Sequence, residues 1–173
     1  SKSGCNAFLG GISKNYHTNL LLSKNPVLVA EADEFDRSFL QLFPDVAVIT
    51  STDADHLDIY GDVCTIKAAF AEFASQIKES GSLVLKKGVS IDASNIKAKV
   101  YSYSFNGTAD NNEKNAEVIE GGYYKFDIVY PSYTTIYGEN ISGGEISGCV
   151  LGVPGWVNAE NAIAASATAL LGG

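Results

Sequence analysis

Residues 45–85 contain the pattern that decides the fold. Asp-Val-Ala-Val-Ile-Thr (residues 45–50) opens this stretch and Ser-Leu-Val-Leu (residues 82–85) closes it. Short, continuous apolar runs of this kind are typical of strands buried on both faces, as in parallel sheets. Between them, apolar residues recur at intervals of three and four from Asp62 to Lys78, which predicts an amphipathic helix that Gly81 terminates. The stretch therefore predicts a strand, a crossover helix and a second strand.

The segments on either side continue this pattern. Pro-Val-Leu-Val-Ala (residues 26–30) predicts an earlier strand of the same sheet. Residues 91–97 form a short crossover segment, and Lys99 to Phe105 predict a later strand. The first hundred residues are therefore typical of an α/β fold with a mostly parallel sheet flanked by helices.

The second half of the chain has a different pattern. Residues 106–114 predict a polar turn, and an alanine-rich stretch from Val157 to Leu171 predicts a final helix. Between them, apolar and polar residues alternate and glycines mark the turns, which predicts a small antiparallel sheet. The alternating segments are residues 116–120, 123–130, 134–137 and 146–151.

Composition indicates a folded, water-soluble chain. With 173 residues, 46% of them hydrophobic and 18% charged, we expect one domain spanning residues 1–173. The three cysteines, at 5, 64 and 149, fit neither a disulfide framework nor a paired zinc spacing, so we expect buried or inert thiols and a reducing compartment, the cytoplasm. Because the chain contains no methionine, we expect it to be a piece of a longer protein.

The net charge of −8 comes from one segment. Residues 31–62 hold nine acidic residues and one basic residue, which leaves 11 of each for the rest of the chain. Nucleic acids and anionic membranes require a basic surface, so neither is an expected partner.

Two acidic clusters each follow a predicted strand. Glu31-Ala32-Asp33-Glu34 follows the strand at 26–30, and Asp53-Ala54-Asp55-His56-Leu57-Asp58 follows the strand at 45–50. Crowded carboxylates repel one another unless protons or cations compensate them, and hard divalent cations prefer oxygen ligands. Because ligands bind at the carboxyl ends of parallel strands, the two clusters could converge on one ion. For the first cluster, the alternative is a solvated acidic turn that caps a helix starting near Glu34. For the second cluster, the alternative is that His56 is a surface or hydrogen-bonded residue.

A third candidate element begins the final helix. Pro154 and Gly155 form a turn, and Asn158 and Asn161 are three residues apart, so their side chains share one helix face. Their amides both donate and accept hydrogen bonds, as recognition of a purine edge requires. A capping role at the start of the helix is the alternative.

Together these segments resemble the central ATP-binding domain of the Mur ligases, most closely the alanine-adding branch. The resemblance lies in Ala7-Phe8-Leu9-Gly10-Gly11, Glu31 to Leu40, Asp55-His56-Leu57-Asp58-Ile59-Tyr60-Gly61, and Pro154-Gly155 with Asn158 and Asn161. It implies a P-loop-type middle domain that uses ATP and Mg2+. In the complete enzyme, the carboxylate of UDP-N-acetylmuramate would be phosphorylated to an acyl phosphate. The amine of L-alanine would then attack it, in cytoplasmic peptidoglycan precursor synthesis.

The resemblance also implies residue roles. Glu31 and His56 would be catalytic and would hold magnesium, with Asp33 and Glu34 as supporting ligands. Asn158 and Asn161 would contact adenine. Val157 stands where the family usually has a histidine.

The resemblance further implies that this chain is a fragment. The Gly-x-x-Gly-Lys-Thr phosphate loop is expected just upstream of residue 1, as is a uridine-binding domain, and an amino-acid-binding domain is expected after Gly173. We therefore expect the isolated fragment to be inactive. The alternatives are a murein tripeptide recycling ligase and a non-catalytic acidic module that binds a metal ion or a protein.

Overall fold

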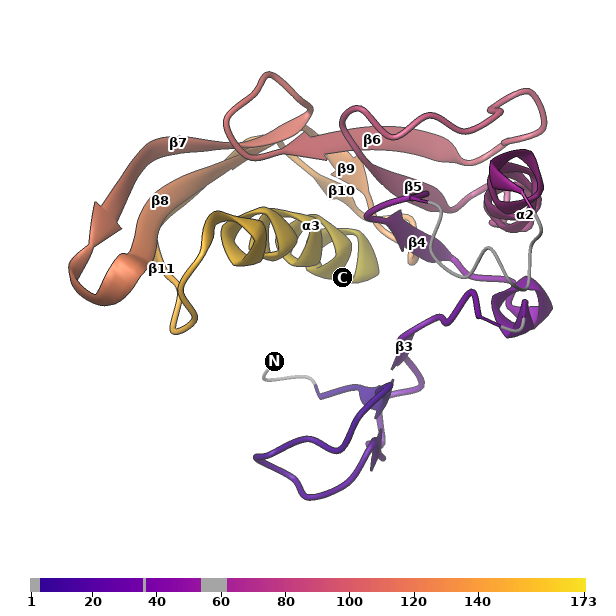
Figure 1. Cartoon of the computed structure of the whole chain (residues 1–173), viewed down its shortest axis with the longest axis horizontal. Coiled ribbons are helices and arrows are strands. Elements are labelled where there is room, and N and C mark those ends of the chain that lie inside the picture. Colours follow the sequence, from indigo (N-terminus) through magenta and orange to yellow (C-terminus); the bar gives the residue numbers. More distant parts are fainter. Residues whose placement is uncertain (1–3, 36, 54–61) are drawn as a thin grey trace. The chain divides into compact units, whose positions relative to one another are not determined.

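The computed structural model describes residues 4–35, 37–53 and 62–173. The chain divides into two compact units, Ser1–Leu42 and Phe43–Gly173 (Figure 1). No helix in the described ranges is long and apolar enough to span a membrane.

The first unit is built on a three-stranded sheet with the order β2-β1-β3. The central strand β1 (Asn6–Phe8) pairs antiparallel with β2 (Leu20–Leu21) and parallel with β3 (Leu28–Ala30). The side chain of Asn6 stabilises the turn before β3, since it donates to the carbonyl of Asn25 at 2.7 Å. A short 3-10 helix, η1 (Ser38–Gln41), follows.

The second unit contains a mixed six-stranded sheet with the order β11-β8-β7-β6-β5-β4. Strands β4 to β7 run parallel, and β8 and β11 run antiparallel to their neighbours. A separate small antiparallel pair is formed by β9 and β10. The strand bounds are β4 (Val46–Ile49), β5 (Ser82–Lys86), β6 (Lys99–Ser104), β7 (Asn111–Ile119), β8 (Tyr123–Tyr130), β9 (Tyr133–Thr134), β10 (Asn140–Ile141) and β11 (Gly144–Val150), and a 3-10 turn, η2 (Glu120–Gly122), joins β7 to β8.

Two helices complete the second unit. Helix α2 (Val63–Ser75) lies between β4 and β5 in the chain and starts at the N-cap Asp62, whose carboxylate accepts a 2.8 Å hydrogen bond from the N–H of Thr65. This bond lowers the pKa of Asp62. Helix α3 (Trp156–Gly172) runs across one face of the sheet and contacts strands β4 to β9 (Figure 1).

The core lies between α3 and the sheet. Small and branched side chains of α3 pack on aromatic and aliphatic residues of β5, β6 and β8, which excludes water from the interface. Phe105 meets Phe126 edge to face, with ring centroids 5.8 Å apart. The buried α3 residues in this core are Ala159, Ile163, Ala164, Ala167 and Leu171.

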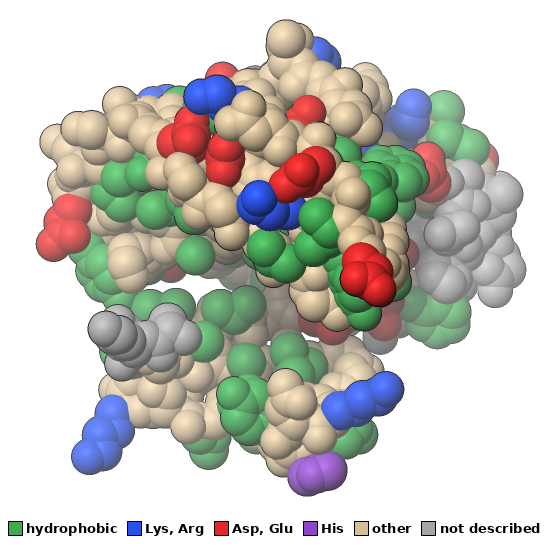
Figure 2. Space-filling model, turned by 90° about the vertical axis from the view of Figure 1, so that its left-hand side faces the viewer, with side chains coloured by type: hydrophobic (Ala, Val, Ile, Leu, Met, Phe, Trp, Pro, Cys, Tyr) green, Lys and Arg blue, Asp and Glu red, His purple; other side chains and the backbone are tan. Residues whose placement is uncertain are grey.

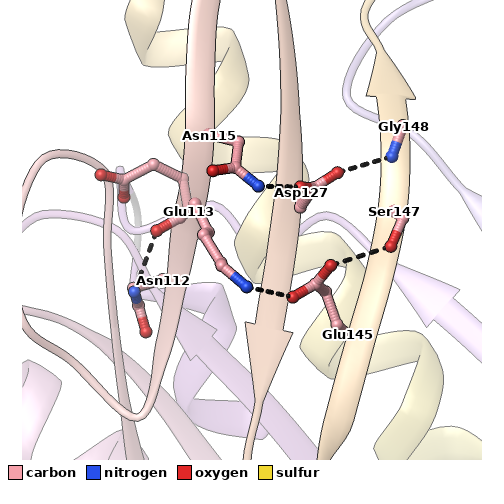
Figure 3. A network of polar contacts seen from close by, with 8 residues as sticks. Asn112, Glu113, Asn115, Asp127, Glu145, Ser147 and Gly148 are labelled. Atoms are coloured by element: carbon pink, nitrogen blue, oxygen red, sulfur yellow. Dashed lines mark hydrogen bonds and ion pairs between the residues drawn. The ribbon is translucent and has the colours of Figure 1, made fainter.

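In the six-stranded sheet, the pairing of β8 is irregular on both sides, and the carboxylate of Asp127 connects the two irregular positions. The register of β7 with β8 shifts between Lys114 and Glu117, and that of β11 with β8 shifts between Ile146 and Cys149. Asp127 on β8 bridges both positions, because it accepts hydrogen bonds from the Asn115 side chain and the Gly148 N–H, each at 2.7 Å (Figure 3). These two bonds lower the pKa of Asp127, with the larger effect coming from Gly148.

The structure confirms the predicted fold class and corrects several details. The expected parallel sheet, the helix after Asp62 and the final helix are all present. However, β7 starts at Asn111, so the polar turn is shorter than predicted, and β7, β8 and β11 extend the large sheet. A strand's hydrogen-bond partners come from distant segments, so local alternation does not say which sheet the strand joins.

The predicted strands at 26–30 and 45–50 both form, as β3 and β4. Strand β3 belongs to the three-stranded sheet of the first unit, and β4 is an edge strand of the six-stranded sheet of the second unit. The sequence pattern shows that a segment can form a strand, whereas its burial depends on what packs against it. The three cysteines are free; Cys64 is exposed, and Cys5 and Cys149 are half-buried.

Candidate functional site

A cavity opens at the carboxyl ends of β1 and β3. Because these strands are parallel, the residues that follow them reach the same edge of the sheet, where open α/β sheets place their ligands. The cavity has a volume of about 440 Å³, within the usual range for small-molecule sites. Its lining comes from the first unit: Phe8, Leu9, Gly10, Asn19, Glu31, Ala32, Asp33 and Glu34.

Glu31 is held at this cavity by its backbone and its side chain. Its N–H donates to the carbonyl of Phe8 at 2.9 Å, and its Oε2 accepts a 2.7 Å hydrogen bond from the N–H of Gly10. A Cβ on Gly10 would lie 2.9 Å from the Glu31 carboxyl carbon, so this approach requires glycine. Gly10 thus makes a close approach to a carboxylate of the same unit.

Asp33 and Glu34 lie in a turn after β3. Asp33 Oδ1 accepts a 2.9 Å hydrogen bond from the N–H of Phe35, and the carbonyl of Glu34 accepts one from the N–H of Arg37 at 3.1 Å. The next described helical segment, η1, starts at Ser38 and has no acidic residue in its first turn. The acidic turn of the alternative interpretation is therefore present, but Arg37 occupies the N-cap position of η1.

The carboxylates at the cavity fit part of a magnesium site. Mg2+ is usually held by one or two protein carboxylates together with water and substrate phosphates. Glu31 Oε1 is not engaged by Gly10, and Asp33 contributes a second carboxylate to the same cavity. Among residues 4–35, 37–53 and 62–173, no group of three possible metal ligands comes together. Two carboxylates at one cavity thus suit a hard cation that takes its remaining ligands from elsewhere.

The second acidic cluster falls mainly outside the described residues. His56, Asp55 and Asp58 lie in the range 54–61, so their convergence with Glu31 remains a prediction. Strand β3, which precedes Glu31, lies in the first unit, and β4, which precedes the second cluster, lies in the second unit.

The asparagine pair lies at the start of α3. Gly155 has a φ of 101° and occupies the N-cap position without a side-chain cap, so neither asparagine is an N-cap. The Asn158 Nδ2 group instead donates back to the carbonyl of Pro154 at 2.7 Å. Asn158 is half-buried and Asn161 is exposed. The Asn158 amide, which is fixed against the turn, and the exposed Asn161 amide thus lie on one face of the first two turns of α3.

A buried glutamate between these asparagines was not predicted. Glu160 is 4% exposed, and its Oε2 pairs with the Nζ of Lys86 at 2.8 Å. The sequence signal is its spacing from Ile163, Ala164 and Ala167, which places a carboxylate on the apolar face of the helix. A charge at such a position requires a partner.

Charged side chains elsewhere lie interspersed. On the face that Figure 2 shows, lysine and arginine side chains stand singly, and some of them lie beside acidic ones. Three ion pairs among the described residues join separate segments of the second unit: Lys78–Asp45, Lys114–Glu145 and Lys125–Glu117. In each of them, both side chains are about one-third exposed or more.

Comparison with known proteins gives close relatives along the whole chain. Two proteins named UDP-N-acetylmuramate--L-alanine ligase are 43% identical over 171 residues (Porphyromonas gingivalis) and 44% identical over 175 residues (Phocaeicola vulgatus). These alignments cover 98% and 100% of this chain and 35% of each relative. The chain therefore spans about a third of the length of these relatives.

A solved structure shares the fold. The UDP-N-acetylmuramate:L-alanyl-gamma-D-glutamyl-meso-diaminopimelate ligase of Neisseria meningitides matches with a TM-score of 0.74, over 99% of this chain and 54% of that chain. Its sequence identity is 21%, so this likeness shows the fold alone. The family model of the Mur ligase middle domain matches residues 18–169. With that match over most of its length, the chain belongs to the Mur ligase middle domain family.

Proposed function

We propose that this chain is the middle-domain portion of a cytoplasmic, ATP-dependent ligase that joins L-alanine to UDP-N-acetylmuramate in peptidoglycan precursor synthesis. The observation that carries this proposal is the identity of 43 to 44%, along nearly the whole chain, with ligases of that name. The rest of the parent protein would supply the phosphate loop, the uridine-binding domain and the amino-acid-binding domain. The isolated chain would then be inactive.

In this proposal, the cavity beside β1 and β3 binds the magnesium end of the nucleotide. The Gly10 N–H orients the Glu31 carboxylate and leaves Oε1 available to the ion, while Asp33 and Glu34 support it. His56 would serve a second magnesium ion. Mg2+ supplies charge neutralisation at the phosphates, which is most of what phosphoryl transfer requires from its surroundings.

The start of α3 would bind the adenine base. Asn161 is exposed, and Asn158 keeps its Oδ1 and one N–H beyond the bond to Pro154. Amide side chains pair well with the donor and acceptor edge of adenine. Val157 is 48% exposed, so it offers an apolar contact where a histidine is usual in the family.

The experiment uses the full-length protein and measures ADP release that depends on UDP-N-acetylmuramate and an amine. We expect turnover with L-alanine and little with the L-alanyl-γ-D-glutamyl-meso-diaminopimelate tripeptide. Glu31→Ala and His56→Ala should each reduce turnover at least 100-fold, with unchanged circular dichroism.

Three outcomes would contradict parts of this proposal. Preference for the tripeptide would favour the recycling ligase. Metal binding without nucleotide and without turnover would favour the non-catalytic module. Full turnover by both variants would remove the assigned roles of Glu31 and His56.

A further inference from the structure

Glu160 lies on the opposite side of α3 from solvent, between the two asparagines in sequence. Its carboxylate is in the core beneath the second turn of the helix, whereas Asn161 next to it is exposed. The neighbouring core positions on this face are filled by Ala159, Ile163 and Ala164. A carboxylate among them is expensive, because charge must be removed from water.

The carboxylate binds the ends of two adjacent strands. Its Oε2 pairs with Lys86, the last residue of β5, and its Oε1 accepts a 3.3 Å hydrogen bond from the N–H of Phe105, just after β6. One side chain therefore connects the second turn of α3 to both strands.

The same lysine also contacts the first turn of the helix. The Nζ of Lys86 lies 5.9 Å from the ring centroid of Trp156, within cation-π distance. The first and second turns of α3 are thus held through one lysine. These are the turns that carry Asn158 and Asn161.

A tyrosine completes the polar cluster. Tyr103 is the register partner of Lys86 and is fully buried, and its hydroxyl has no hydrogen-bond partner within the described part of the chain. Burial, followed by the negative charge of Glu160, raises the pKa of this hydroxyl, so it stays protonated. The cluster holds a single negative charge, on Glu160, and a single positive charge, on Lys86.

We propose that Glu160, through its pair with Lys86, is a positioning residue that sets the orientation of the Asn158 and Asn161 amides and thereby the selectivity for adenine. This inference rests on the proposed function, in which these amides bind the base. An apolar residue in place of Glu160 would also fill this space in the core. However, both carboxylate oxygens of Glu160 are engaged, one by Lys86 and one by the N–H of Phe105, and hydrogen bonds are directional, whereas apolar contacts tolerate small rotations and shifts of the helix. Hydrogen bonds from the Asn158 and Asn161 amides to a base edge require that the helix does not rotate or shift.

The test compares ATP with inosine triphosphate in the full-length ligase. Inosine has a 6-oxo group in place of the 6-amino group of adenine, so it reports on amide recognition. In Glu160→Leu we expect KM for ATP to rise about tenfold, with kcat and KM for UDP-N-acetylmuramate nearly unchanged. The preference for ATP over inosine triphosphate should fall by a similar factor. Glu160→Gln keeps an acceptor for the N–H of Phe105 but removes the charge. Its KM for ATP should therefore lie between those of the wild type and Glu160→Leu.

Ile163→Val is the matched control, because it loosens the same face of α3 without touching the carboxylate. A general loss of stability would affect Glu160→Gln and Ile163→Val alike. If both Glu160 variants kept the wild-type nucleotide preference, or only matched the control, the positioning role would be refuted.

Two further variants separate this inference from the function on which it rests. If Asn158→Ala and Asn161→Ala raise KM for ATP while the Glu160 variants do not, the adenine site stands and the positioning role fails. If the asparagine variants leave KM for ATP unchanged, the adenine site itself is wrong and the positioning role fails with it.

Discussion

Replacing Lys86 by methionine should detach the start of α3 from the sheet. The substitution removes the partner of a carboxylate that is 4% exposed and leaves it only the 3.3 Å hydrogen bond from Phe105. Removing one member of a buried ion pair costs about 3 to 5 kcal/mol, whereas exposed pairs contribute at most about 1 kcal/mol. The Lys86 side chain is 32% exposed, so water screens part of the interaction. We therefore expect a cost of about 3 kcal/mol, at the lower end of the buried range.

Hydrogen exchange followed by mass spectrometry measures this change locally in the full-length protein. A loss of about 3 kcal/mol in local opening free energy corresponds to roughly 150-fold faster exchange. Peptides from residues 156–172 should show this acceleration. Peptides from β7 and β8 provide the internal control, because Asp127 and its hydrogen bonds are unaffected by the substitution.

The double variant Lys86→Met with Glu160→Met provides the decisive comparison. Since it leaves no uncompensated buried charge, its exchange should return to within about fivefold of the wild-type rate. The reasoning is refuted if Lys86→Met alone changes exchange in α3 by less than about threefold. It is also refuted if the double variant exchanges as fast as the single one.

Two further substitutions test other parts of the structure. Gly10→Ala places a Cβ 2.9 Å from the carboxyl carbon of Glu31 and should lower ligation by the full-length protein at least tenfold. Gly11→Ala has open space around its Cβ and should retain wild-type ligation, and equal losses in both would contradict the role of Gly10. The Gly148 N–H lowers the pKa of Asp127, so this carboxylate stabilises the fold above its ordinary pKa, and the contribution is lost as the pH falls through the lowered value. Asp127→Asn should therefore lower the urea midpoint at pH 7 and have a smaller effect below about pH 4, and an equal effect at both pH values would refute this sign.

Segments with local patterns could be predicted well. The period of three and four between Asp62 and Lys78 predicts α2, and the alanine-rich stretch predicts α3, because helix hydrogen bonds join residues four apart. The apolar runs likewise predict β4 and β5. Each of these elements depends on residues close together in the chain.

Sheet membership could not be predicted in the same way. The run before Glu31 forms β3 as expected, but its partner is β1, more than 20 residues earlier. Pairing between distant segments depends on what the rest of the chain makes available. The predicted convergence of Glu31 and His56 depends on such long-range pairing, and it stays a prediction.

The candidate site likewise combines features that the sequence predicts with features that only the tertiary structure shows. Composition and motifs alone identify Glu31, Asp33, Asn158 and Asn161 as residues able to bind a cation or a base, because those abilities belong to the side chains themselves. Only the tertiary structure places the Glu31 carboxylate against the Gly10 N–H and buries Glu160 against Lys86. These contacts join residues 21 and 74 positions apart, and no local pattern encodes which distant atoms will meet when the strands and helices pack.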